Sequence, residues 1–100
     1  MAYTNMRDYK DAIKDLNHAL EIAPQFQSAL VWRGIAYTEM RKFDEAMMDL
    51  NLALKLDPFD YMALKNRGYL FAELNKYDDA VDDMRNAYTT PKQIGLFGRP

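Results

Sequence analysis

The sequence contains no cysteine, a single histidine, a single serine and only four glycines. Without cysteine there can be no disulfide bonds, thiolate metal sites or thiol catalysis. His18 and Ser28 fall on different predicted helices, and no motif places an acid beside them, so a catalytic triad is not supported. The glycines are too scattered to form a phosphate-binding loop. We therefore expect no catalytic residues, no cofactor and no metal, and predict that the chain is not an enzyme.

The sequence also lacks a long hydrophobic run and an excess of one charge. No apolar stretch approaches the roughly 18 residues that a membrane span needs, and the first ten residues contain no apolar signal-peptide core. The 15 acidic and 13 basic residues are interspersed, which argues against binding to nucleic acid or to an anionic membrane. A cytoplasmic location is the default expectation.

What the sequence does contain is enough apolar and aromatic side chains for one folded domain. Hydrophobic residues make up 49% of the 100 residues, and aromatic residues make up 13%. Aromatic side chains each bury a large area, so this composition argues against intrinsic disorder.

The strongest signal in the sequence is an internal repeat of 34 residues. This spacing separates prolines, glycines, aromatic residues and alanines in several independent columns. The columns are Pro24 and Pro58; Gly34 and Gly68; Tyr9, Phe43 and Tyr77; Ala12, Ala46 and Ala80; Ala19, Ala53 and Ala87; Leu16, Leu50 and Met84; and Tyr3, Tyr37 and Phe71.

Within each period the apolar residues follow a helical spacing. Leu30, Gly34 and Tyr37 are separated by steps of four and three, which place them on one face of an α-helix. Each period therefore predicts two helices, A and B, joined by a short polar turn. Proline follows the B helices, where it stops the helix. The predicted helices span residues 8–22, 26–40, 43–56, 60–74 and 77–89.

The small residues predict how the two helices of a period pack. We expect Gly34 to face Ala46 and Gly68 to face Ala80, so that the helix backbones approach closely. A glycine inside a helix costs about 1 kcal/mol relative to alanine, and a close contact would compensate for that cost. Phe43 is then expected to fill the space near the turn, as is Tyr77.

These columns resemble the signature of the tetratricopeptide repeat family. The matching residues are Arg33-Gly34, Tyr37, Ala46, Leu50, Ala53 and Pro58, followed by Arg67-Gly68, Phe71, Ala80, Met84 and Ala87. The resemblance implies an all-α fold, an α-solenoid of antiparallel helix-turn-helix repeats with a right-handed superhelix. It divides the chain into a repeat domain of residues 1–91 (partial repeat 1–26, repeats 27–60 and 61–91) and a tail of residues 92–100.

The two ends of the chain depart from the family pattern. The first repeat is incomplete, the third lacks a proline in register, and the tail does not resemble a polar capping helix. We therefore expect either a piece of a longer array or ends that a partner covers. Self-association through the uncapped ends, giving a homo-oligomer, is the alternative to binding a different protein.

The resemblance implies a concave groove lined by the A helices, in which a scaffold or adaptor protein binds a peptide or helix of its partner. The side chains expected there, together with Met1, are Asn5, Ser28, Val31, Trp32, Ile35, Glu39, Met62, Lys65, Asn66, Tyr69 and Glu73. Trp32 is the preferred anchor for a partner; the alternative is that it packs against Lys65 or Met62 and only stabilises the stack.

Some family members hold a chaperone's terminal carboxylate with a clamp of Lys, Asn and Arg. The aligned positions here are Trp32, Met62 and Asn66, so the clamp is not matched and a ligand with apolar anchors is expected.

Two charged pairs recur with the repeat and are expected to be structural ion pairs: Arg33 with Asp49, and Arg67 with Asp83. Across the repeat interface, Asp15 is expected to reach Arg33, and Asp49 to reach Arg67.

Overall fold

A computed structural model describes residues 6–89, and this part of the chain is built of helices without any β-strand. The five helices are α1 (Met6–Ile22), α2 (Gln27–Glu39), α3 (Phe43–Leu56), α4 (Tyr61–Glu73) and α5 (Tyr77–Tyr88). Every predicted helix is present, and each end lies within two residues of its predicted position. The predicted all-α fold is confirmed. Met1, Asn5 and residues 92–100 lie outside the described residues.

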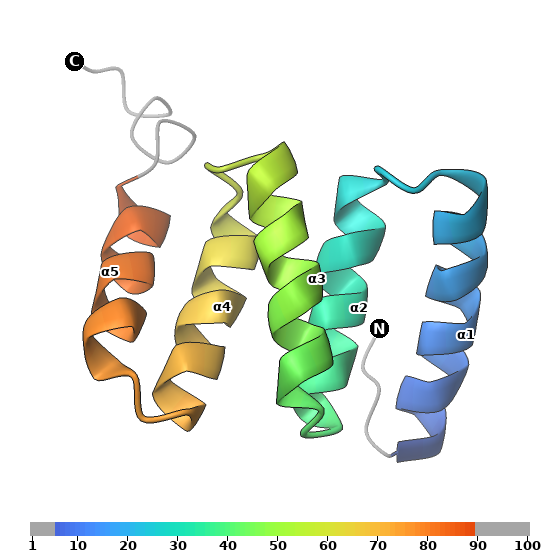
Figure 1. Cartoon of the computed structure of the whole chain (residues 1–100), viewed down its shortest axis with the longest axis horizontal. Coiled ribbons are helices and arrows are strands. Elements are labelled where there is room, and N and C mark those ends of the chain that lie inside the picture. Colours follow the sequence, from blue (N-terminus) through green and yellow to red (C-terminus); the bar gives the residue numbers. More distant parts are fainter. Residues whose placement is uncertain (1–5, 90–100) are drawn as a thin grey trace.

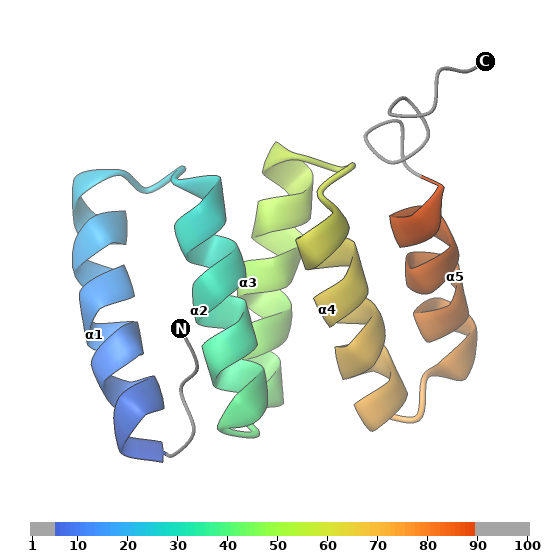
Figure 2. The same ribbon diagram turned by 180° about the vertical axis from the view of Figure 1, so that it is seen from behind.

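The helices follow one another along the long axis, each antiparallel to the one before it (Figure 1). The most extensive packing occurs within two hairpins, α2 with α3 and α4 with α5. Helix α3 lies in front of α2 in Figure 1 and behind it in Figure 2, so the A helices α2 and α4 present a different side of the molecule from α3. Helices α1 and α5 lie at opposite ends of the array. Among the described residues no helix has the length and apolar character that crossing a bilayer requires.

The turn inside each hairpin depends on one residue with a left-handed backbone. Arg41 has a φ of 61° and Asn75, its counterpart in the next repeat, has a φ of 63°. This conformation reverses the chain within three residues, and asparagine adopts it at a lower cost than arginine. Acidic residues then open the next helix, where they oppose the positive end of its dipole; they are Asp44, Glu45, Asp78 and Asp79.

The link between repeats is fixed by a capping residue. Asp60 is the N-cap of α4, and its Oδ1 accepts a hydrogen bond from the backbone N–H of Met62 at 3.0 Å. Its Oδ2 accepts a second hydrogen bond from Gln27 Nε2 at 2.6 Å. Because Gln27 begins α2, this one carboxylate both starts a helix and joins the A helices of successive repeats.

The core lies between the helices of each hairpin and between neighbouring hairpins. Leu30, Leu50 and Leu70 are fully buried, and so are the alanines of the B helices, Ala46, Ala53 and Ala87. A Cβ atom placed on Gly34 would lie 2.8 Å from Leu50 Cγ and 3.5 Å from the Ala46 carbonyl oxygen. The close approach predicted at this glycine is therefore present, but the side chain that fills the space is Leu50 rather than Ala46.

The two aromatic residues at the hairpin turns behave differently. Phe43 is partly buried, and the guanidinium of Arg41 lies 5.1 Å from the centre of its ring. Tyr77 is 61% exposed, and its hydroxyl donates to Asn75 Oδ1 at 2.8 Å. The expectation that Tyr77 fills the turn was wrong, because its hydroxyl finds a partner at the surface.

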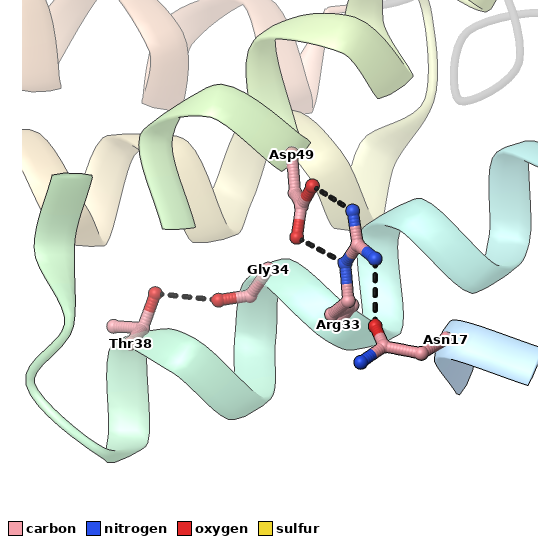
Figure 3. A network of polar contacts seen from close by, with 5 residues as sticks. All are labelled: Asn17, Arg33, Gly34, Thr38 and Asp49. Carbon is pink, nitrogen blue, oxygen red and sulfur yellow. Dashed lines mark hydrogen bonds and ion pairs between the residues drawn. The ribbon is translucent and has the colours of Figure 1, made fainter. Parts of the chain in front are cut away.

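The predicted ion pairs are present and have nearly identical geometry. Arg33 donates to Asp49 through Nε at 2.7 Å and Nη2 at 2.8 Å (Figure 3). Its remaining Nη1 donates to Asn17 Oδ1 on α1 at 2.7 Å. The partner across the repeat interface is thus Asn17, and the expected contact with Asp15 is absent from the described residues. Asp15 lies two residues earlier on α1, where its side chain is exposed.

The second pair repeats this arrangement one period later. Arg67 donates to Asp83 at 2.7 and 2.8 Å, and to Asn51 Oδ1 at 2.9 Å. Asn51 therefore takes the place that was expected for Asp49, which is already held by Arg33. Each three-residue link therefore joins three successive helices, which are α1, α2 and α3 in the first link and α3, α4 and α5 in the second.

Candidate binding surface

A cleft of about 350 Å³ lies between α2 and α4. Its walls come from the C-terminal halves of both A helices and from the turn that leads into α3. The lining residues are Ile35, Thr38, Glu39, Arg41, Phe43, Asn66, Tyr69 and Glu73. The two A helices lie next to each other because α3 packs against both of them.

The cleft brings together five of the residues that were expected to line a groove. Ile35 and Glu39 come from α2, and Asn66, Tyr69 and Glu73 come from α4. The structure adds three residues that the sequence reasoning missed, Thr38, Arg41 and Phe43. Their position beside the polar turn was visible in the sequence, but the left-handed backbone of Arg41 and the contact of its side chain with Glu73 on α4 were not.

The chemistry of the cleft is mixed. Tyr69 is 57% exposed and offers a large aromatic surface, while Glu39 and Glu73 place exposed carboxylates at the rim. Arg41 Nη2 lies 3.6 Å from Glu73 Oε1, and both side chains are about half exposed or more. An exposed pair of this kind contributes less than about 1 kcal/mol, so both charges can be redirected to a bound molecule at little cost.

Two polar side chains of the cleft are directed by their own helices. Thr38 Oγ1 donates to the Gly34 carbonyl, and Asn66 Nδ2 donates to the Met62 carbonyl, both at 2.8 Å. In both bonds the side-chain donor is satisfied by the carbonyl oxygen four residues earlier on the same helix. They leave the Asn66 Oδ1 atom as an acceptor on the cleft wall.

Trp32 lies outside the cleft lining, although it belongs to the same helix stripe. It is 52% exposed and precedes Ile35 by one turn of α2. Lys65, one of the two residues that it was expected to pack against, instead holds its ammonium 5.6 Å from the ring centre of Tyr61. The indole therefore extends the exposed apolar surface of α2 beyond the cleft.

The remaining predicted residues are less accessible, apart from Ser28, which is exposed at the start of α2. Val31 is buried in the core with Leu20 and Leu54, so it does not belong to an open surface. The spacing of Val31 on α2 fits the groove stripe, but packing against the neighbouring helices covers it. Met62 is partly buried and packs against the same cluster.

A second hollow, of about 500 Å³, is lined by residues of α1, α2 and α3, among them Asn17, Arg33 and Asp49. Arg33 donates hydrogen bonds to both Asn17 and Asp49, and the hydrogen bond to Asp49 raises the pKa of Arg33 above its ordinary value. The charges of Arg33 and Asp49 in this hollow are therefore already paired. Within the described part of the chain no three His, Cys, Asp or Glu side chains gather closely enough to hold a metal ion.

A search of curated proteins finds no significant match to this chain. The sequence model of one protein family, described as Psidin, N-terminal TPR repeats region, matches residues 3–95. TPR (tetratricopeptide) repeats generally mediate protein–protein interactions and are generally non-catalytic. The match covers nearly the whole chain and agrees with the stacked helical hairpins, and the chain therefore belongs to this family of tetratricopeptide repeat regions.

Proposed function

We propose that this chain is a scaffold or adaptor module that binds a peptide or helix of a partner protein along α2 and α4. The observation that supports the proposal is the cleft between these helices, in which an exposed Tyr69 lies beside the carboxylates of Glu39 and Glu73. Exposed aromatic residues next to charged groups are typical of surfaces that anchor a protein partner.

The ligand that fits this surface has apolar side chains flanked by a basic residue. Tyr69 and Trp32 supply the apolar contact, and Glu39 or Glu73 accepts hydrogen bonds from a lysine or arginine. Arg41 can release Glu73 and bind an acidic or carbonyl oxygen of the ligand instead. The stacked hairpins hold these side chains before the ligand arrives, so less conformational entropy is lost on binding.

The proposal is tested by quantitative affinity capture with the full chain and three variants. Tyr69→Ala and Trp32→Ala should each reduce the bound partner about tenfold or more, as expected for aromatic anchors. Tyr77→Ala is the matched control, because Tyr77 is similarly exposed at 61% but lies on α5, outside the cleft. Circular dichroism should remain helical for all of them.

The proposal fails if Tyr69→Ala and Trp32→Ala retain the same partners in the same amounts as the unmodified chain. It also fails if Tyr77→Ala loses them equally, because the contact would then not depend on the cleft.

A further inference from the structure

The asparagine that links one repeat to the next is replaced by an arginine on α5. In the two interior links, Asn17 and Asn51 each accept a hydrogen bond from the arginine of the following A helix. The residue 34 positions after Asn51 is Arg85. A guanidinium has donors only and carries a positive charge, so it cannot accept from another arginine and would repel it.

The apolar positions around Arg85 continue the interior interface between repeats. Leu20 and Leu54 are buried, and the third member of their column, Tyr88, is 62% exposed. Val81 is 53% exposed, whereas Ile13, which lies two periods earlier in the same register, is buried. Val81, Arg85 and Tyr88 are spaced by four and three residues, which places them on one stripe of α5.

Helix α4 adds a second cation to this surface. Lys65 lies one period of 34 residues after the buried Val31, at the equivalent position of the next repeat. Its ammonium lies 5.6 Å from the ring centre of Tyr61. The Tyr61 ring in turn meets the Tyr88 ring edge-on, with 5.7 Å between centroids. The two tyrosines therefore form an aromatic pair beside Lys65, and Arg85 precedes Tyr88 by one turn of α5.

No carboxylate neutralises Arg85 strongly within the described residues. Its Nη1 lies 3.6 Å from Asp82 Oδ1, and both side chains are about two-thirds exposed. Such a pair on one helix surface contributes only a few tenths of a kcal/mol. Arg85 is therefore available to a stronger acceptor.

We propose that the end face formed by Tyr61, Lys65, Val81, Arg85 and Tyr88 binds an amphipathic helix of another protein that carries a carboxylate. A helix is the fitting occupant, because α2 on α1 and α4 on α3 cover the equivalent interior surfaces. In this complex the carboxylate occupies the position that Arg33 and Arg67 occupy in the interior links, and it accepts hydrogen bonds from the Arg85 guanidinium. Residues 90–100 contain Lys92 and Arg99 but no aspartate or glutamate side chain, which favours an occupant from outside these residues.

This surface shares no residue with the cleft lining between α2 and α4, and the inference therefore goes beyond the proposed function. It assigns a different ligand to each surface. The cleft presents carboxylates, whereas the end face presents two cations beside aromatic rings.

The test uses a helix that is already known to fit the interior version of the surface. A fluorescent peptide of residues 60–74, stapled because short helices are marginal in water, is titrated with the full chain in two forms. One form carries Glu in place of Arg67, and the control form keeps Arg67. We expect the Glu form to bind at least tenfold more tightly by fluorescence anisotropy.

Variants of the full chain make the charge dependence specific. Arg85→Glu should reverse the preference between the two peptides, and Arg85→Asn should restore binding of the Arg67 form by recreating the interior residue. Arg85 is exposed, so circular dichroism and the melting temperature should be unchanged. Tyr69→Ala, which alters only the cleft, should leave both affinities unchanged.

The proposal is overturned if the two peptides bind equally, or if neither binds at about 1 mM, where even weak contacts are detected. It is also overturned if sedimentation velocity shows that the full chain self-associates and that Arg85→Glu abolishes this, because the occupant would then be a second copy. Neither result bears on the cleft, whose partner is tested by the Tyr69→Ala variant.

Discussion

Arg67 holds the carboxylate of Asp83 with two parallel hydrogen bonds, Nε to Oδ2 at 2.7 Å and Nη2 to Oδ1 at 2.8 Å. The same two-bond geometry joins Arg33 to Asp49 one repeat earlier. Both carboxylates are buried, so each needs its arginine in place. The pairs therefore set the register between the helices of each hairpin, and with it the relative positions of the A helices that form the cleft.

Removing the buried carboxylate of Asp49 should strongly destabilise the fold. Asp49→Ala leaves the partly buried guanidinium of Arg33 without its partner, and breaking such a pair costs about 3 kcal/mol. The free energy of unfolding is measured by urea denaturation followed by circular dichroism. Asp15→Ala is the matched control, because Asp15 occupies the same register on α1 but is exposed. Equal losses for the two variants would show that the Arg33 pair adds no stability.

The two interior glycines should respond differently to alanine. At Gly34 a new Cβ would lie 2.8 Å from Leu50 Cγ, and crowding this buried leucine should outweigh the helix-propensity gain of about 1 kcal/mol. At Gly68 the nearest atoms belong to the flexible Met84 at 3.3 Å, which can move aside. Gly34→Ala should therefore lower the melting temperature, while Gly68→Ala leaves it unchanged or raises it. The opposite order would contradict the packing described for Leu50.

The cap of α4 should contribute measurably to stability. Asp60→Ala removes the acceptor for the Met62 N–H and also the bond from Gln27, so it should cost about 1 to 2 kcal/mol. Gln27→Ala keeps the Met62 bond and removes the bond to Asp60 together with a longer one, at 3.4 Å, to the Ala53 carbonyl oxygen, so it should cost less. Both values come from denaturant titration, and the cap would have no role if the two variants lost the same stability.

Replacing Asn51 with arginine should weaken the hydrogen-bonded link between α3 and α4. The reason is the one given for Arg85: a guanidinium at this register repels the arginine of the following A helix. In Asn51→Arg the new guanidinium faces Arg67, which loses its acceptor and meets a like charge at a cost of about 1 kcal/mol. Added salt should recover part of the loss, because it screens exposed charges. Asn86→Arg, at an exposed position on α5, is the control and should be neutral. A loss that salt does not change would point to a steric rather than an electrostatic cause.

The repeat and the helix boundaries could be predicted from the sequence because they depend on local spacing. Apolar steps of three and four define each helix, and proline and polar turns end it, so no knowledge of distant contacts is needed. The Arg33 and Asp49 pair was also predictable, because its members recur with the repeat as Arg67 and Asp83.

The details of the surfaces could not be predicted in this way. Helix spacing places Val31 and Ile35 on one stripe, but only the packing of neighbouring helices buries the first and leaves the second at the cleft. The choice of Asn17 over Asp15 as the partner of Arg33 likewise depends on how α1 is rotated against α2.

The sequence by itself determined the α-helical solenoid, its 34-residue register and the residues that pair within a hairpin, because these follow from periodicity along the chain. Only the tertiary structure decided which side chains remain open to a partner, since exposure depends on what the adjacent helices cover. Val31 and Lys65 share one register, yet Val31 is buried and Lys65 remains partly exposed next to Tyr61 at the end of the array.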